Sequence, residues 1–272
     1  MVELLSWNMN RQGLWNEITA DASLDLALLQ EAPRPPQDLA SATSPDPRQK
    51  WRTEGWTTES RTCVVRLSTR VALHGRSLRD PADGDVAALG ASRLGSLTVA
   101  DVHRGEEYLF TVASAYANWE SSADQSDLIF ADASAHRLLS DLSVLITGRS
   151  KERLVIAGGF NILHGYGEHG DTYWGQRYQN VFDRAEAMGL VYCGPEHPNG
   201  RQADPWPDEL PTASRNVPTF RHSRQSVEGA SRQMDFVFAT SNLTGHINTS
   251  ARNGVAEWGK SDHCQIRISL DL

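Results

Sequence analysis

Two short runs of the sequence are apolar at almost every position, and they constrain the fold most. Residues 25–30 read DLALLQ, and residues 153–163 read RLVIAGGFNIL, where four consecutive apolar residues precede a glycine pair. A β-strand that is apolar on both faces has to be covered on both sides, as strands are inside layered α/β proteins. The chain therefore needs a sheet with further layers around it, and 272 residues are enough to build them.

The rest of the sequence alternates between strand-like and helix-like segments. Apolar residues spaced three and four apart predict helices at 14–22, 132–147 and 174–188, the last of which ends before Gly189. Proline-rich stretches predict loops at 33–55 and 194–218. Because no linker divides the sequence, we predict a single α/β (α+β) domain over residues 1–272, with helices flanking its sheets. Its other predicted strands are 2–7, 61–67, 95–102, 107–116, 233–239, 246–251 and 264–270.

Charge and composition limit the class of function. The net charge is −8, so any nucleic-acid binding requires a local basic groove or metal ions. The three cysteines have no paired spacing, which predicts free thiols in a reducing compartment. We find no signal-peptide pattern and no apolar run of membrane-spanning length, so we expect a cytoplasmic protein without membrane contact. Nothing in the sequence indicates an obligate protein partner.

Polar side chains stand at the ends of several predicted strands or inside them. Asp235 is the hardest to explain structurally, because burying a charge in an apolar strand is costly unless the charge is paired. His263 is its natural partner, since a carboxylate fixes the tautomer of an imidazole and favours its charged form. Glu31 with Asp262, or with asparagine oxygens, supplies the oxygen ligands that Mg²⁺ prefers. Together these residues suit metal-assisted phosphoester hydrolysis, although each motif alone is more typical of a strand end entering solvent.

Five segments in this order resemble the motifs of the endonuclease/exonuclease/phosphatase superfamily, whose members include deoxyribonuclease I-like and exonuclease III-like enzymes. The segments are LLSWNMN, LALLQE, VIAGGFN, RQMDFVFA and WGKSDHCQI. The resemblance covers essentially the whole chain. It implies a four-layer sandwich of two packed mixed sheets flanked by helices, with the site at one edge. It also implies phosphoester cleavage with Mg²⁺ as the cofactor, or Mn²⁺ in its place.

The resemblance assigns roles to the polar residues at the strand ends. Glu31 would be the principal metal ligand, with Asn8 and Asp262 near the same metal. His263 would be the catalytic histidine, and Asp235 its carboxylate partner. The isolated motifs carry little weight, but their order along the chain is specific.

Three more residues match positions that surround the phosphate in the superfamily. Asn161 resembles the asparagine that steadies the attacked phosphate. Tyr116 resembles an active-site tyrosine of the exonuclease III-like branch, but the asparagine usually found three residues later stands two later, at Asn118. Tyr116 is therefore equally well explained as a core aromatic at a strand end. Thr219 resembles a threonine that contacts phosphate.

One position departs from the superfamily pattern. Gly159 stands where the family motif has the aspartate that orients or deprotonates the attacking water. Loss of a positioned base costs about 10²–10⁴ in rate. The chain could be an altered copy of an active enzyme or a pseudoenzyme that binds without cleaving, and we favour the altered enzyme because the other signature residues are intact. A third explanation is a substitute carboxylate or metal site in the next loop, which carries His164, Glu168, His169 and Asp171.

The loops offer two candidates for substrate binding. Arg201 and Trp206 lie in the second proline-rich loop without an evident core role, and such side chains bind phosphate and stack bases. We therefore predict a nuclease that cleaves DNA or RNA, with Gly159 impairing or abolishing its activity. Two alternatives are a phosphodiesterase or phosphatase for small molecules, and a non-catalytic nucleic-acid-binding pseudoenzyme.

Overall fold

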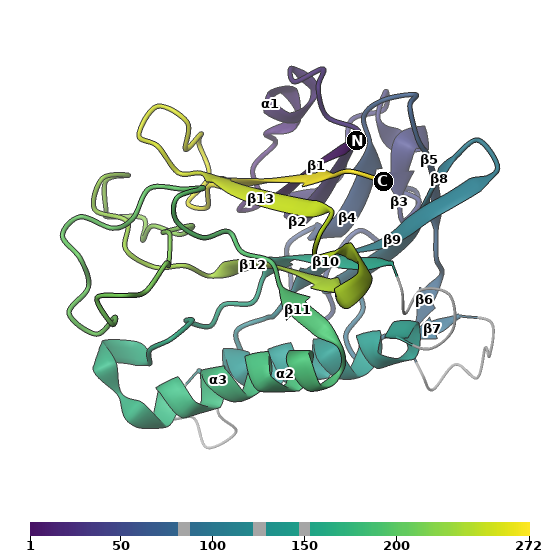
Figure 1. Ribbon diagram of the computed structural model, residues 1–272. Helices are drawn as coiled ribbons and strands as arrows, with labels where there is room; N and C mark the ends of the chain where they lie inside the picture. Colours follow the sequence, from purple (N-terminus) through teal and green to yellow (C-terminus); the bar gives the residue numbers. More distant parts are fainter. Residues whose placement is uncertain (81–87, 122–128, 147–152) are drawn as a thin grey trace.

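The apolar segments form two six-stranded sheets in the computed structural model, which describes residues 1–80, 88–121, 129–146 and 153–272 (Figure 1). One central pair in each sheet is parallel and the other neighbours are antiparallel, so both sheets are mixed. Sheet 1 has the order β13 (Ile247–Arg252), β14 (Gln265–Leu270), β1 (Val2–Asn8), β2 (Leu26–Pro33), β4 (Ser60–Arg66), β3 (Thr43–Ser44). Sheet 2 has the order β11 (Leu190–Tyr192), β12 (Asp235–Thr240), β10 (Leu154–Gly159), β9 (Glu107–Tyr116), β8 (Leu97–Arg104), β5 (Ala72–Gly75).

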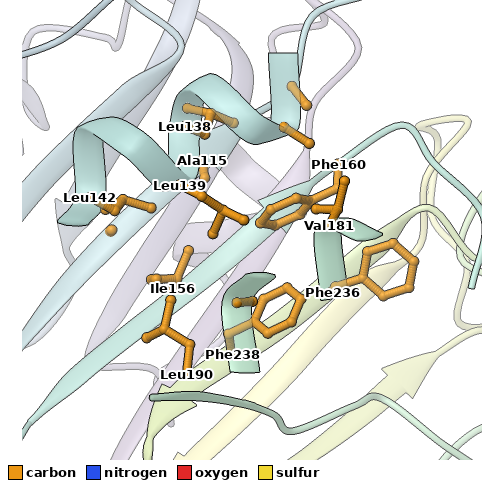
Figure 2. Close-up of a cluster of buried hydrophobic side chains, with 14 of the residues drawn as sticks. Ala115, Leu138, Leu139, Leu142, Ile156, Phe160, Val181, Leu190, Phe236 and Phe238 are labelled. Carbon is orange, nitrogen blue, oxygen red and sulfur yellow. The ribbon is translucent and has the colours of Figure 1, made fainter. Parts of the chain in front are cut away.

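The layers follow from the alternation of side chains along the strands. Apolar side chains of both sheets, such as Leu28 and Val155, fill the space between the sheets. The other face of sheet 2 packs against α2 (Ala131–Leu142) and α3 (Thr172–Ala187), which lie side by side along one side of the molecule (Figure 1). Figure 2 shows this cluster, with Ile156 facing the helical leucines. The outer face of sheet 1 packs against α1 (Trp15–Thr19) and neighbouring loops. This arrangement confirms the predicted four-layer α/β fold.

The helices differ from the predicted segments mainly at their ends. The first predicted helix, 14–22, ends early at Thr19, because the carboxylate of Asp21 accepts hydrogen bonds from Ser23 in a tight turn. The third starts two residues early, where Asp171 caps the backbone N–H groups of Tyr173 and Trp174. The second predicted helix, 132–147, continues from α2 into a 3₁₀ turn, η3 (Ser143–Ile146), and its residue 147 lies outside the described residues.

Several short elements were not expected from the sequence. The strands β5 and β11 lie at the edges of sheet 2, and β6 (Leu78–Arg79) pairs with β7 (Leu89–Gly90) in a separate two-stranded ribbon. The first proline-rich loop contains η1 (Ala40–Ala42) as well as β3. Two further 3₁₀ turns are η5 (Glu168–Gly170) and η6 (Ser241–Leu243). No helix among the described residues is both long and apolar enough to cross a membrane.

Candidate active site

The predicted catalytic and metal-binding residues meet at one edge of the sandwich, where strands of both sheets end. Gly159, the last residue of β10, lies in register with Asp235 of β12 on one side and with Tyr116 of β9 on the other. In sheet 1, Asn8 ends β1 beside the C-terminal part of β2. The backbone therefore places these positions next to one another through strand pairing alone.

Asp235 and His263 form the buried centre of the site. The Nδ1 atom of His263 lies 2.7 Å from the Oδ2 atom of Asp235, and both side chains are about 95% buried. Burial alone would lower the pKa of His263, but the charge and hydrogen bond of Asp235, together with Asp262 and Glu31, raise it to about 9. The imidazole is therefore protonated at neutral pH, and its Nδ1–H donates to the carboxylate.

Asn8 connects this pair to Glu31. The amide nitrogen of Asn8 lies 3.1 Å from Oε1 of Glu31 and 3.4 Å from Nε2 of His263. A bulge in the pairing of β2 with β4 places Glu31 at a positive φ of 45°, which turns its side chain out of the regular strand alternation. Its other oxygen, Oε2, lies 3.2 Å from Nε of Arg11, whose side chain is half exposed. The bulge thus explains how a strand residue reaches the site edge.

Tyr116 and Asn161 complete the side of the site built by sheet 2. Burial is the main reason that the pKa of Tyr116 is far above its usual value, and the nearby Glu31 raises it further. The phenol therefore keeps its proton beside Glu31 and Asn161. Asn161 has a positive φ of 53°, and its Nδ2 donates to the carbonyl of Ala117 at 2.7 Å. The contact with Glu31 places Tyr116 in the site as well as in the core.

Asn118 is a polar residue of this region to which the sequence assigned no role. Its side chain is fully buried, and neither its oxygen nor its nitrogen has a hydrogen-bond partner among the described residues. Its backbone N–H donates to the hydroxyl of Ser134. The only sequence signal was its place two residues after Tyr116. An unsatisfied buried amide is unusual and is consistent with a polar group that a ligand would complete.

Gly158 and Gly159, the two glycines that end β10, have different structural requirements. A Cβ atom on Gly158, which has a φ of +152°, would overlap the backbone carbonyl of Ala115, so this position requires glycine. A Cβ atom on Gly159 would lie 3.4 Å from Oδ1 of Asp235 and 3.6 Å from the ring of Tyr116, which are acceptable contacts. The backbone therefore has room for a side chain at position 159. The fold does not demand glycine at position 159.

The oxygen ligands at the site suit a hydrated magnesium ion. Mg²⁺ usually binds one or two carboxylates and keeps several waters, and Glu31 with the half-buried Asp262 supplies two such groups near Asn8. The described residues hold no group of three or more His, Cys, Asp or Glu side chains arranged to bind a metal. An ion bound to Glu31 would compete with Arg11 for its carboxylate.

Three residues predicted to bind substrate are engaged elsewhere. Arg201 donates to the backbone carbonyls of Gln202, Val227 and Asn253, so it holds neighbouring loops together. The indole N–H of Trp206 donates to Leu210 in the same loop. Thr219 is fully buried, and its hydroxyl accepts the N–H groups of Met234 and Asp235. The prediction of direct phosphate contact by Thr219 is therefore corrected to a role in positioning Asp235.

Three of the four polar residues singled out in the loop after the glycine pair are engaged with other groups. Glu168 forms an ion pair with Arg232, with 3.0 Å between their charged atoms, and Asp171 caps α3. His164 packs between the rings of Phe182 and Tyr192, and burial lowers its pKa. His169 belongs to the short η5 turn. These contacts argue against a metal or proton-transfer site in that loop.

Comparison with known structures identifies the fold. The catalytic domain of Xenopus laevis APE2 superposes with a TM-score of 0.62 at 15% identity, over 99% of this chain and 91% of that one. The endonuclease domain of TRAS1, a telomere-specific non-LTR retrotransposon, gives 0.59 at 14% identity, over 100% and 99%. The AP endonuclease LMAP from Leishmania major gives 0.59 at 14% identity, over 100% and 88%. No protein-family model and no curated protein sequence matches the chain.

These comparisons confirm at the level of the fold the superfamily resemblance predicted from the five motifs. The chain has a deoxyribonuclease I-like fold. The descriptions of several neighbours name an endonuclease or an exonuclease. At identities of 14–16%, this structural likeness shows the fold alone.

Proposed function

We propose that this protein is a divalent-metal-dependent phosphoester hydrolase, most specifically a nuclease for DNA or RNA, whose turnover is limited by Gly159. The proposal is carried by one observation: the buried Asp235–His263 pair lies beside Asn8 and Glu31 at a single edge of the fold. Both sheets contribute to that edge, so we also infer that residues 1–272 act as one domain.

The side chains at this edge are suited to binding a phosphate. His263 carries a positive charge at neutral pH, held in place by Asp235, and can donate a proton or a hydrogen bond through Nε2. The neutral phenol of Tyr116 and the amide of Asn161 are further hydrogen-bond donors on the sheet 2 side. Fixed donors aimed at the place where negative charge develops are the main means of lowering a phosphoryl-transfer barrier.

Glu31, with Asn8 and Asp262, would hold the metal ion, Mg²⁺ or Mn²⁺. When bound, such an ion neutralises phosphate charge and acts as a Lewis acid. The Arg11–Glu31 ion pair does not prevent this, because Arg11 is half exposed and exposed ion pairs are weak.

The proposed site lacks a general base to deprotonate the attacking water. Gly159 sits between Asp235 and Tyr116 with room for a side chain, and no other carboxylate of the neighbouring loop replaces it. The carboxylate of Asp235 is already committed to His263. We therefore expect the native chain to bind phosphoesters and to cleave them about 10²–10⁴ times more slowly than a version with a carboxylate at position 159.

We favour nucleic acid as the substrate because the descriptions of structural neighbours name enzymes that act on it. Their descriptions include an AP endonuclease from Archaeoglobus fulgidus and a 3′ phosphatase from Neisseria bound to a product DNA hairpin. A specific observation favours a small phosphoester as the second candidate: Arg201, the predicted phosphate contact, bonds backbone carbonyls instead.

The test is cleavage of labelled single-stranded DNA, double-stranded DNA and RNA in Mg²⁺ or Mn²⁺, with EDTA as the negative control. The native chain, Gly159→Asp and Gly159→Asn are compared, because asparagine fills the same space without supplying a base. We expect cleavage by Gly159→Asp and little by the other two. If folded Gly159→Asp cuts no nucleic acid, the nuclease proposal is wrong.

The same proteins separate the alternatives. Hydrolysis of a chromogenic diester such as bis(p-nitrophenyl) phosphate by Gly159→Asp, without nucleic-acid cleavage, would support the small-molecule phosphodiesterase. Tight nucleic-acid binding without turnover of any substrate, even after the aspartate is restored, would support the non-catalytic binding protein.

A further inference from the structure

A cavity of about 1050 Å³ lies at the edge of the sandwich where β3 of sheet 1 faces β5 of sheet 2 (Figure 1). The two edge strands touch: a Cβ atom on Gly75 would overlap the side chain of Ser44. The cavity is lined by the loop that contains η1 and by parts of β4, β5 and β8. None of the candidate active-site residues lines it, so it is a separate site. Its volume suits a small-molecule ligand.

The cavity lining is basic, although the protein has a net charge of −8. Asp46 pairs with Arg48, and Arg76 pairs with Asp101 outside the cavity. Four cations then remain without a carboxylate partner among the described residues. The basic lining residues are Arg48, Lys50, Arg52, Arg61, Arg66 and Arg76, and the acidic ones are Asp46 and Glu54.

Arg61 is the most unusual of these cations because it is buried. Its exposed fraction is 9%, and its nearest partners are neutral: the carbonyls of Thr62 and Lys50, at 3.3 and 3.2 Å, and the ring of Trp51. Burial lowers its pKa, as expected for a charge without an acidic partner. A buried charge is costly unless an opposite charge compensates it. An anion in the cavity would provide that compensation.

Arg66 provides a second anchor on the same strand. Its guanidinium donates to the carbonyl of Ser68 at 3.1 Å and has no acidic partner among the residues that the structure describes. The Cα atoms of Arg61 and Arg66 are five positions apart on β4, which is roughly 16 Å along a strand. Their side chains leave opposite faces of β4, because Cys63 and Val65 pack on the outer face of sheet 1 and Val64 packs between the sheets, yet both line the same cavity at the sheet edge. A ligand that meets both needs more than one anionic group.

The lack of aromatic rings in the described lining of the cavity limits the kinds of ligand that it can recognise. Within the described part of the chain, no Phe, Tyr, Trp or His side chain lines the cavity, so nothing there would stack on a nucleobase. Arginine forks match the oxygens of phosphate groups and bind them in pairs of hydrogen bonds. The lining therefore favours phosphate groups over a base as the feature recognised.

We propose that this edge cavity binds a small ligand bearing two or more phosphate groups, held by Arg61 and Arg66 with Lys50 and Arg52 at its mouth. The site is independent of the proposed hydrolase function, and its ligand need not be the substrate. A phosphodiester chain offers the same phosphate chemistry, but the cavity volume and the buried position of Arg61 favour a small molecule.

Isothermal titration calorimetry on the full chain tests the proposal, with inorganic tripolyphosphate as the probe. Citrate serves as a carboxylate anion of similar charge, and a 12-nucleotide single strand tests the phosphodiester alternative. We expect tripolyphosphate to bind, and Arg66→Gln and Lys50→Gln each to weaken it about tenfold, as for the loss of a hydrogen bond to a charged group. Arg104→Gln, which removes an exposed arginine of β8 outside the cavity, should leave binding unchanged.

The decisive variants are those of Arg66 and Lys50, because Arg61 also bonds backbone carbonyls and its loss would disturb the loop. Absence of tripolyphosphate binding to the folded native chain would overturn the proposal. Equal binding of citrate, equal binding by Arg66→Gln and Lys50→Gln, or tighter binding of the oligonucleotide at the same residues would do so as well. Since the readout is binding, it does not depend on whether Gly159→Asp cleaves any substrate.

Discussion

Folding stability should depend on pH through the buried pair of Asp235 and His263. The pKa of His263 is about 9 in the folded protein, above the ordinary value of 6.5 that we assign to the unfolded chain. The folded state therefore binds this proton more tightly. The resulting stabilisation is complete below about pH 6.5 and is lost as the pH rises through about 9. The difference between these two pKa values corresponds to about 3 kcal/mol in the free energy of unfolding.

The perturbation that isolates this contribution is Asp235→Asn. It keeps the size of the side chain but removes the largest of the influences that raise the pKa of His263, so that burial is opposed only by Asp262 and Glu31. The native chain should exceed the variant in unfolding free energy by an amount that shrinks by about 3 kcal/mol between about pH 6 and pH 9.5. Urea unfolding of both proteins in EDTA, followed by tryptophan fluorescence, measures this difference, and the subtraction removes groups that titrate alike in both.

A stability difference that stays constant across this pH range would refute the reasoning. An NMR titration of the His263 imidazole in the metal-free native chain gives a second measurement, which remains decisive if Asp235→Asn does not fold. A midpoint below pH 7 in that titration would show that Asp235 does not hold the imidazole in its charged form.

Three further predictions concern single substitutions. In the Gly159→Asp background, His263→Ala should lower kcat by about 10²–10⁴ while circular dichroism stays native, and full activity would contradict the assignment of His263. Gly158→Ala should destabilise by about 1–3 kcal/mol because its methyl group meets the carbonyl of Ala115, whereas Gly159→Ala should be nearly neutral, and equal melting temperatures would count against this contrast. Thr219→Val should cost about 1–3 kcal/mol in chemical denaturation, since it leaves two buried N–H groups without their acceptor, and an unchanged midpoint would argue against this role.

The sequence was sufficient for the strands at the centre of the fold and for the polar residues that end them. Continuous apolar runs such as that of β10 have one plausible environment, and Asp235 inside such a run requires a partner. The short edge strands were missed because three or four residues are too few to show a periodic pattern, and their pairing depends on long-range contacts. The intrinsic β-propensity of a short segment says little about whether it forms a strand when pairing with distant strands determines the outcome.

The substrate contacts could not be predicted for a related reason. Arg201 looked available because nothing in a loop sequence shows which backbone carbonyls its guanidinium will meet. The basic cavity is built from positions between 37 and 98 that only the pairing of β3, β4, β5 and β8 brings together. Likewise, the Cβ contacts that distinguish Gly158 from Gly159 depend on the register of β9, β10 and β12.

The hydrogen bond between Asp235 and His263 also joins the two sheets mechanically. Asp235 begins β12 of sheet 2, whereas His263 precedes β14 of sheet 1. Asn8 and Glu31 extend the same edge on sheet 1, and Tyr116 extends it on sheet 2. A phosphate held from both sides would resist sliding of one sheet over the other. Amide hydrogen exchange should then slow in β1 and β10 together on ligand binding, because the bound phosphate couples the two sheets.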